Sequence, residues 1–173
     1  MFDEMIHGDV NPRWPTPASK AVEFAVEKFS DTVVEASELL RLHYAEIAPY
    51  QDLFKLNPDI ATYMKLQATG ILYIVTARSA GKLVGYVSLI VKEHVHYKDV
   101  LMATDDIHFL HPDWRKGGTG LRMLKFAEQK MREMGVKVMA LRTKVASNHG
   151  VLFERLGYEP MDVVYLKRLD QEP

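Results

Sequence analysis

Apolar and polar residues alternate along several short stretches of the chain, which is the pattern of a half-buried strand. In residues 21–29, valine and phenylalanine alternate with glutamate. Residues 71–78 and 83–94 are two further candidate strands, and they flank Ser-Ala-Gly-Lys, which is typical of a hairpin turn. Gly85 interrupts the second of them and indicates a bulge. Strands are also predicted over residues 100–110, 136–145 and 163–169.

Other stretches show the period of a helix. Ser30 can cap the first helix, which extends to about Ala48. The apolar stripe that this helix is expected to bury consists of Val33, Ala36, Leu40, Tyr44 and Ile47. Asn57 with Pro58 starts a second helix, and Gly70 ends it. Two more helices are predicted, one ending at Gly135 that buries Leu121, Leu124, Ala127, Met131 and Met134, and a short one over residues 147–157.

The order of these elements, β-α-α-β-β-β-α-β-α-β, predicts a mixed sheet with helices on both faces. The 173 residues fit one domain, and no repeat, low-complexity run or linker divides them. Residues 1–18 are expected to form an irregular arm, because the three prolines there cannot donate backbone hydrogen bonds. Residues 19–173 then form the single domain.

Composition narrows the functional classes. A net charge of −1 gives no general attraction to nucleic acid or to an anionic membrane, so we expect neither as a partner. Without cysteine, the chain cannot form a disulfide, a thiolate zinc site or a cysteine nucleophile. No apolar stretch approaches the ~20 residues of a membrane span, and the acidic N-terminus lacks the pattern of a signal peptide. We therefore expect a cytoplasmic protein.

The stretch HPDWRKGGTGLRM, residues 111–123, joins a predicted strand to the third helix. A glycine-rich turn at a helix start presents backbone N–H groups at the positive end of the helix dipole, and this arrangement binds phosphate. The nucleotide-binding pattern G-x-x-x-x-G-K-[ST] is not met, because Leu121 and Arg122 follow Gly120. The dinucleotide pattern G-x-G-x-x-G also fails, since no third glycine follows. A solvated turn, in which glycine only relieves strain, is the alternative.

The hexapeptide Arg115-Lys116-Gly117-Gly118-Thr119-Gly120 follows the pattern R-x-x-G-x-G, and SNHGVLFERLGYEP arrives one predicted strand later. Together they resemble the two motifs of the GNAT superfamily of N-acetyltransferases, over roughly residues 20–169. The resemblance implies an α+β (mixed α/β) fold, a mostly antiparallel mixed sheet of about six to seven strands flanked by about four helices. It also implies transfer of an acetyl group from acetyl-CoA to a primary amine, by direct attack in a ternary complex.

The same resemblance implies which residues bind acetyl-CoA, a cosubstrate. They are Leu110, Arg115, Lys116, Gly117, Gly118, Thr119, Gly120, Asn148 and Phe153. The loop amides would bind the diphosphate, the N–H of Leu110 the thioester oxygen, and Asn148 would approach the pantetheine arm. Asn148 could equally cap a helix, and any cation of the loop could be an ordinary surface charge.

The strand that leads into the loop carries the candidate general base. With a period of two, Thr104, Asp106 and His108 are expected on one face. An amine with a pKa of about 10.4 must lose a proton before it attacks. The resemblance places an acidic residue, a histidine or a bound water on that face, so Asp106 is the first choice and His108 the second. Asp106 could instead cap a turn or pair with an arginine, and His108 could be a core histidine.

The general acid departs from the family pattern. The usual tyrosine falls on position 153, where this chain has Phe153, which has no proton to donate. Another tyrosine could replace it, the thiolate could leave unaided, or the protein could lack catalysis. Tyr158 is the nearest tyrosine and remains a catalytic candidate, although packing suits its position better. The alternative function is a non-catalytic acyl-CoA-binding or protein-interaction module of the same fold.

His94 and His96 lie on one face of a predicted strand, and two histidines with a carboxylate could bind zinc. The spacing assigns no third ligand, so no metal site is predicted, and the histidines are expected to be structural or to line the acceptor site. The acceptor is open between a small molecule and a protein amine. The family resemblance is also compatible with a homodimer.

Overall fold

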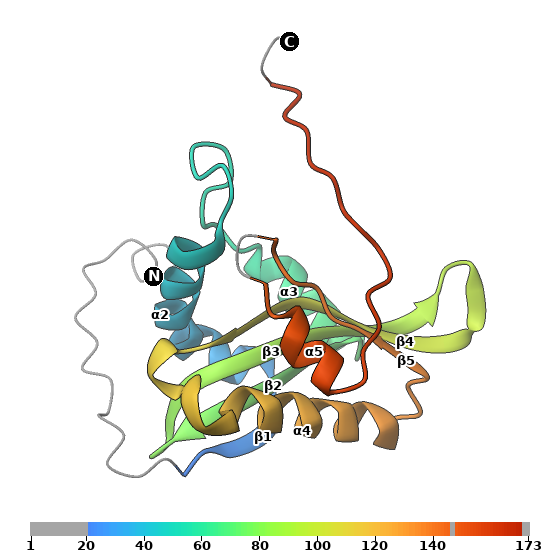
Figure 1. Cartoon of the computed structure of the whole chain (residues 1–173), viewed down its shortest axis with the longest axis horizontal. Coiled ribbons are helices and arrows are strands. Elements are labelled where there is room, and N and C mark those ends of the chain that lie inside the picture. The colour runs from blue at the N-terminus through green and yellow to red at the C-terminus, as the bar shows by residue number, and fades with distance from the viewer. Residues whose placement is uncertain (1–20, 146–147, 171–173) are drawn as a thin grey trace.

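The computed structural model describes residues 21–145 and 148–170. Its centre is a five-stranded mixed sheet with the order β1-β2-β3-β4-β5 (Figure 1). The strands are β1 (Glu23–Glu27), β2 (Leu72–Ser79), β3 (Lys82–His94), β4 (Tyr97–Leu110) and β5 (Val138–Ala140). The first four pair antiparallel, and β5 pairs parallel with β4. The expected mostly antiparallel mixed sheet is confirmed, with fewer strands than the six to seven predicted.

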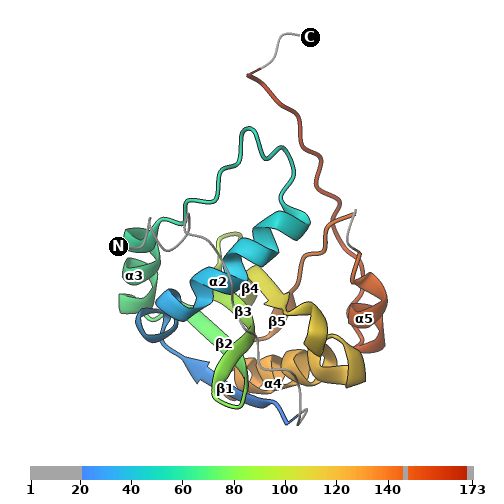
Figure 2. The same ribbon diagram turned by 90° about the vertical axis from the view of Figure 1, so that its left-hand side faces the viewer.

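Helices cover both faces of this sheet. α2 (Phe29–Ile47) and α3 (Ile60–Ala68) lie on one face, and α4 (Thr119–Glu133) and α5 (Gly150–Arg155) pack on the other (Figure 2). Each face has its own apolar core, around Leu39 and Phe109 beneath α2 and around Leu89 and Met131 beneath α4. The predicted α+β class is therefore confirmed. In the described part of the chain, no helix has the length and apolarity that a membrane span requires.

Turn and cap chemistry sets most boundaries. The β2–β3 hairpin turns at Ala80 and Gly81, whose φ angles of 48° and 77° are the positive values that a two-residue hairpin turn favours. The Asp59 side chain accepts a hydrogen bond from the Thr62 N–H at 2.9 Å and caps α3, a role predicted for Asn57.

The start of α2 also differs from the prediction. The helix begins at Phe29, and its N-cap residue, Lys28, has no capping side chain, so Ser30 is not the cap. Ser30 lies inside the first turn, where its N–H donates to Gln67 Oε1 at 3.0 Å. The helix is thus anchored to α3 by this hydrogen bond instead of by a local cap.

The register shifts at three places in the sheet, one of them at the β3–β4 hairpin, where Glu93 pairs with Leu101 and His94 with Tyr97. In β3, Ala77 pairs with Gly85 and Arg78 with Leu83, so Val84 is the extra residue, and the bulge predicted at Gly85 is confirmed within one position.

The second bulge lies in β4. Ser88 pairs with Ile107 and Leu89 with Asp105, which leaves Asp106 as the extra residue. A bulge adds one position to the alternation of side chains, so the face of every later residue is reversed relative to a regular strand.

The last predicted strand is wrong. Residues 163–169 have no regular secondary structure, and apolar side chains there are exposed, Tyr165 by 89 %. The segment extends away from the body after α5 (Figure 1). The neighbouring β5 is three residues long instead of the ten predicted, so it offers few backbone groups for a sixth strand. The arm predicted over residues 1–18 lies outside the described residues.

Candidate active site

β4 and β5 separate directly after a short paired segment, whose last pair is Thr104 with Ala140. Beyond it, the carboxylate of Asp105 fills the gap. Its Oδ1 accepts hydrogen bonds from the N–H of Arg142 at 3.0 Å and from Arg142 Nε at 3.2 Å. Asp105 is only 2 % exposed, and these bonds compensate the burial of its charge. Past Asp105, the edge of β4 that faces away from β3 pairs with no described strand.

The backbone of Leu110 points into this gap. The N–H of His111 donates to the Val84 carbonyl at 2.8 Å, so the His111 backbone faces β3. Successive residues of an antiparallel strand face alternate sides, so the N–H and C=O of Leu110 face away from β3. The Leu110 carbonyl accordingly accepts a hydrogen bond from Arg115 Nε at 2.9 Å. The Leu110 N–H therefore has the direction expected of a donor to a thioester oxygen.

Gly85 allows β3 to approach β4 closely at this point. A Cβ on Gly85 would lie 2.8 Å from Leu110 Cδ1, closer than real Cβ contacts, and 3.0 Å from the Phe109 carbonyl oxygen, which is a tight contact. The glycine that the sequence indicated as a bulge therefore also leaves room for the backbone of Phe109 and Leu110.

The glycine loop follows Leu110. Two short 3₁₀ turns, Pro112–Trp114 and Lys116–Gly118, lead from β4 into α4. Gly117 and Gly118 have φ angles of 77° and 75°, which other residues adopt only with strain. The first turn of α4 therefore begins in the tight loop that the sequence predicted, with its N-terminal N–H groups at the end of β4.

Gly120 brings this helix end to the gap. A Cβ on Gly120 would lie 3.8 Å from both Leu110 Cδ2 and Leu152 Cδ2, which is ordinary contact. The first turn of α4 thus lies between the end of β4 and α5. The loop amides, the Leu110 N–H and α5 are brought together, as the two sequence motifs predicted.

Arg115 is engaged within the protein. Its Nη1 and Nη2 bind the two carboxylate oxygens of Glu46 at 2.8 and 2.6 Å, while Nε holds the Leu110 carbonyl. The hydrogen bond from Arg115 lowers the pKa of Glu46, which keeps that carboxylate charged. Arg115 therefore ties α2 to the loop, and a direct contact of its side chain with phosphate stays a prediction. Lys116 is exposed at the loop surface.

Asp106 faces α3. The Tyr63 hydroxyl donates to Asp106 Oδ2 at 2.5 Å. Burial, and then the hydrogen bond to Asp106, raise the pKa of Tyr63 far above its usual value, so the phenol keeps its proton and remains a donor. The carboxylate is thereby oriented by a partner that lies 43 residues away, and no local pattern pairs the two.

His108 lies on the other side of the strand. Its Nδ1 is 2.8 Å from Asp105 Oδ2, and its ring lies edge-on against Phe153, with centroids 5.8 Å apart. The expectation that Thr104, Asp106 and His108 share one face is therefore wrong for His108. The bulge at Asp106 reverses the alternation between Asp106 and His108, so the two candidate bases contact opposite helical layers.

Asn148 and Tyr158 frame α5. The Asn148 side chain accepts a hydrogen bond from the Gly150 N–H at 2.7 Å, but the N-cap residue of α5 is His149, so Asn148 is not the cap that was its alternative role. The Tyr158 ring packs against Phe153, and its pKa is raised by burial and by the nearby Glu128 carboxylate.

The Tyr158 hydroxyl lies far from the N–H of Leu110. Glu128 follows Gly120 by about 12 Å along α4, at 1.5 Å per residue. The Tyr158 hydroxyl, buried near Glu128, is thus held in the α4 core, and the structure does not bring it to the glycine loop.

His94 and His96 lie at the β3–β4 hairpin, with ring centroids 5.8 Å apart. His94 pairs with Tyr97 and Leu89 with Asp105, so His94 lies five residues, about 17 Å, along β3 from the partner of Asp105. A place for these histidines in the acceptor site stays a prediction. Among the described residues, no cluster of three or more histidine or acidic side chains could hold a metal ion.

Three residues of the site were not predicted. Tyr63 and Glu46 are far in sequence from their partners, and no local pattern marks them. Asp105 carried one signal, a carboxylate on the apolar face of a strand, which in a folded protein requires a buried partner. Its partners, His108 and Arg142, became identifiable only once the bulge and the β5 divergence were known.

The comparisons with known proteins agree with this geometry. The family model described as "Acetyltransferase (GNAT) domain" matches residues 69–160, just over half of the chain. No curated protein sequence matches the chain.

Many solved structures share the fold. One is a ribosomal-protein-alanine N-acetyltransferase from Brucella melitensis biovar Abortus 2308, 21% identical over 86% of this chain and 99% of that chain, with a TM-score of 0.64. Another is an aminoglycoside acetyltransferase from an uncultured soil metagenomic sample, in complex with trehalose, with 18% identity, 86% and 96% coverage and a TM-score of 0.67. A predicted acetyltransferase with acetyl-CoA from Clostridium acetobutylicum gives 14% identity, 88% and 100% coverage and a TM-score of 0.65. These likenesses concern the fold, and together with the family match they show that the chain belongs to the GNAT acetyltransferase family.

Proposed function

We propose that this protein is an N-acetyltransferase that moves an acetyl group from acetyl-CoA to a primary amine in a ternary complex. The observation that carries the proposal is the free edge of β4 at Leu110, which opens beside the N-terminus of α4. One short region thus offers a backbone donor for a carbonyl oxygen and a cluster of helix-end N–H groups for an anion.

The chain's own groups supply the binding side. The N–H groups at the start of α4, with Gly117 and Gly118 allowing the tight turn, would hold the diphosphate. Arg115 would hold this loop in place by its hydrogen bonds to Glu46 and to the Leu110 carbonyl. The exposed Lys116 would add positive charge. Acetyl-CoA would supply the activated acetyl group as a thioester.

Asp106 is the proposed base. It lies on β4 four residues before Leu110, and Tyr63 fixes its orientation by donating to Oδ2. The face that it shares with α3 is opposite to the glycine loop, so an amine and the coenzyme would approach β4 from different sides. Asp106 would attract the ammonium form and accept one of its protons, which frees the lone pair with which the neutral amine attacks.

His108 is the proposed acid. Its ring contacts Phe153, the residue at the family's tyrosine position, and Asp105 orients it through Nδ1. In the doubly protonated imidazole, Nδ1–H would donate to Asp105, and the Nε2–H could be given to the departing sulfur. In the balanced reaction, the nitrogen of the ammonium form passes one proton to Asp106, the C–N bond forms and the C–S bond breaks. The nitrogen then releases a second proton to solvent, and a proton from His108 passes to the thiolate.

The alternative is a non-catalytic acyl-CoA-binding or protein-interaction module, which Phe153 favours. Both functions require that acetyl-CoA binds to the protein, and calorimetric titration measures this binding. Saturable binding is expected, and its absence would reject both functions. Thiol release with a panel of primary amines then separates them. Turnover with an amine supports the transferase, whereas binding without turnover across the panel supports the module.

A further inference from the structure

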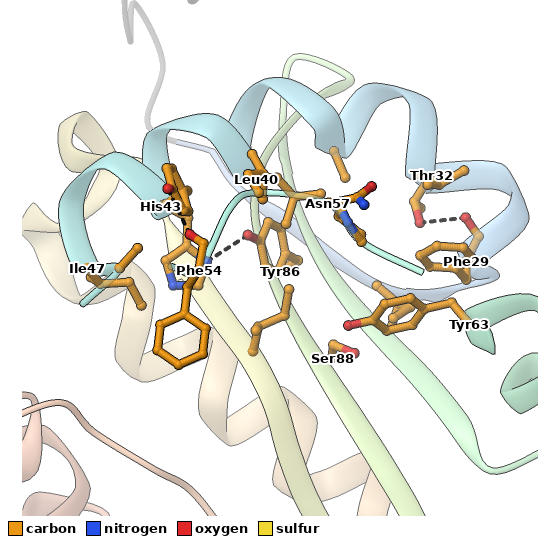
Figure 3. A pocket seen from close by; sticks show the side chains of 18 of the residues that line it. Phe29, Thr32, Leu40, His43, Ile47, Phe54, Asn57, Tyr63, Tyr86 and Ser88 are labelled. Carbon is orange, nitrogen blue, oxygen red and sulfur yellow. Dashed lines mark hydrogen bonds between the residues drawn. The ribbon is translucent and has the colours of Figure 1, made fainter. Parts of the chain in front are cut away.

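The apolar stripe predicted on α2 packs only in part against the core, where Ala36 and Leu40 contact the cluster around Leu39 and Phe109. The residues of this helix that are fully buried are Thr32, Ser37, Leu39 and His43, whereas the predicted stripe is only half-buried. The stripe residues also line a cavity of about 350 Å³ between α2, the loop at residues 48–58, α3 and the sheet (Figure 3). They are Val33, Ala36, Leu40, Tyr44 and Ile47.

The cavity contains few polar groups, and one of them has no partner. Ser88, on β3, is 3 % exposed, and within the described residues its hydroxyl has no hydrogen-bond partner. It lines the cavity together with Tyr63, and both lie on the side of α2 that faces the sheet (Figure 3). A buried hydroxyl without a protein partner is expected to bond to water or to a ligand.

The histidine in the lining is uncharged at neutral pH. Burial lowers the pKa of His43 to about 4, and Nδ1 lies 2.9 Å from the Tyr86 hydroxyl. The charged residues of the lining are Lys55 and Lys144, both exposed, and no carboxylate is among the described residues that line it. A cavity with this lining repels a ligand that carries several positive charges.

One carboxylate lies next to the cavity. Tyr63 belongs to the lining and donates to Asp106, and Ile107, the neighbour of Asp106 in β4, is also part of the lining. A ligand in the cavity could therefore place one ammonium group at Asp106 while its remaining atoms stay among apolar side chains. The volume is at the lower end of the range for small-molecule sites, about 300–1,000 Å³.

From this arrangement we infer the class of acceptor, an inference that rests on the proposed function. The acceptor is a primary amine on an uncharged apolar body, such as an aromatic ring on a short alkyl arm. The body occupies the cavity beneath α2, Ser88 provides one hydrogen bond, and the nitrogen lies at Asp106. Polyamines and other polycations are excluded by the two lysines and by the lack of carboxylates.

A matched pair of amines tests this class on the unmodified protein. Phenethylamine and ethanolamine both carry a primary amine on a two-carbon arm. The other end of the arm carries a phenyl ring in phenethylamine and a hydroxyl in ethanolamine. With saturating acetyl-CoA, kcat/KM for thiol release should be higher for phenethylamine by at least about tenfold, as expected for filling an apolar pocket. Spermidine should be the poorest of the three. Equal rates, or faster turnover of ethanolamine or spermidine, would overturn the inference and leave the transferase assignment intact.

Two variants of α2 test whether the preference for phenethylamine arises in the cavity. Ala36→Trp would fill it, while Val34→Trp adds the same ring at a position that is 57 % exposed. We expect Ala36→Trp to lose phenethylamine turnover at least about tenfold while keeping the Kd for acetyl-CoA, and Val34→Trp to change neither. If Ala36→Trp retains full phenethylamine turnover, the body binds elsewhere and the inference fails.

Direct binding experiments test the acceptor cavity separately from the proposed acetyl transfer. Calorimetric titration of phenethylamine and ethanolamine into the protein needs no turnover and no acetyl-CoA. Tighter binding of phenethylamine, abolished in Ala36→Trp but not in Val34→Trp, supports the cavity even if acetyl-CoA does not bind. Equal affinity for both amines rejects the cavity as the site of an apolar body, whatever the result with acetyl-CoA. If Ala36→Trp fails to fold, as shown by its thermal transition, the comparison of the two amines on the unmodified protein still decides.

Discussion

His108 and Asp105 are three residues apart in one strand, yet their side chains hydrogen bond, with Nδ1 and Oδ2 2.8 Å apart. In a regular strand, residues at this spacing point to opposite faces. The bulge at Asp106 removes that separation and leaves Asp106 itself facing Tyr63. A single extra residue thus gives the two sides of β4 different chemistry, an Asp–His pair toward α5 and a carboxylate toward α3.

This pair gives the first prediction. His108→Gln should lower kcat by on the order of 10²-fold, because the thiolate would leave without a proton donor. The Kd for acetyl-CoA should change little, since the loop amides bind the diphosphate. Steady-state kinetics and calorimetry measure the two quantities, and added imidazole should restore part of the rate.

Asp105→Asn serves as the companion variant, because it keeps the shape of the side chain and replaces the carboxylate oxygen that lies 2.8 Å from His108 Nδ1. A smaller loss of kcat than in His108→Gln, with a changed pH–rate profile, fits a positioning role for Asp105. If His108→Gln turns over at the unmodified rate, the histidine is not the acid and the thiolate leaves unaided.

The bulge also marks the limit of sequence reasoning here. Periodicity was sufficient for β4 as an element, and the glycine loop, α4 and α5 followed from their turn and cap residues. The face of a residue after a bulge depends on one inserted position, which the alternation of Thr104, Asp106 and His108 does not reveal. The bulge next to Gly85, by contrast, was predictable from the sequence, because glycine destabilises a strand interior unless two backbones approach closely there.

Helical periodicity had a similar limit. Val33 and Leu40 were correctly placed on one stripe of α2, but periodicity cannot say whether a stripe faces core or cavity. The final strand failed for a different reason. Val163 and Tyr165 have strand-forming side chains, but strand formation needs backbone partners, and β5 ends at Ala140.

The second prediction concerns Asp106 and Tyr63. Asp106→Asn removes the proton acceptor and should lower kcat by about 10²-fold or more. Tyr63→Phe removes the donor that orients the carboxylate and should lower kcat less, by roughly tenfold. Both variants should keep the Kd for acetyl-CoA, because the coenzyme is proposed to bind on the opposite face of the strand.

Tyr97→Phe is the matched control for Tyr63→Phe. Tyr97 is 66 % exposed at the far end of β4, so loss of its hydroxyl should leave kcat unchanged. Should Asp106→Asn retain the full rate with a primary amine, proton removal must be assigned to another group or to water.

The third prediction tests the glycine loop. Gly120→Glu should weaken acetyl-CoA binding by at least about 100-fold, because it brings a negative charge to the N–H groups that would hold the diphosphate. The fold should survive, since a Cβ at this position meets only ordinary contacts at 3.8 Å. Calorimetry measures the Kd, and thermal unfolding checks the fold.

Gln129→Glu adds the same charge to the exposed surface of the third turn of α4. It controls for the change in net charge and should leave the Kd within about twofold, because the field of a helix end falls off within the first turn. Unchanged binding in Gly120→Glu would show that the diphosphate does not lie at the start of α4.

The last prediction follows from His43. Its pKa is lowered by burial to about 4, against about 6.5 in the unfolded chain, so the unfolded state binds a proton between these values and the folded state does not. The stabilising contribution of the neutral ring is therefore complete above about pH 6.5 and is lost as the pH falls toward 4, by about 3 kcal/mol in total. His43→Asn should make the free energy of unfolding depend less on pH between pH 6.5 and 4, as measured by urea denaturation. The same variant should lower stability at pH 7, because it removes the hydrogen bond to Tyr86. His96→Asn, at an exposed hairpin position, should keep the slope of the unmodified protein. An equally steep slope in His43→Asn would mean that other groups, such as His111, whose pKa is also lowered by burial, account for the acid sensitivity.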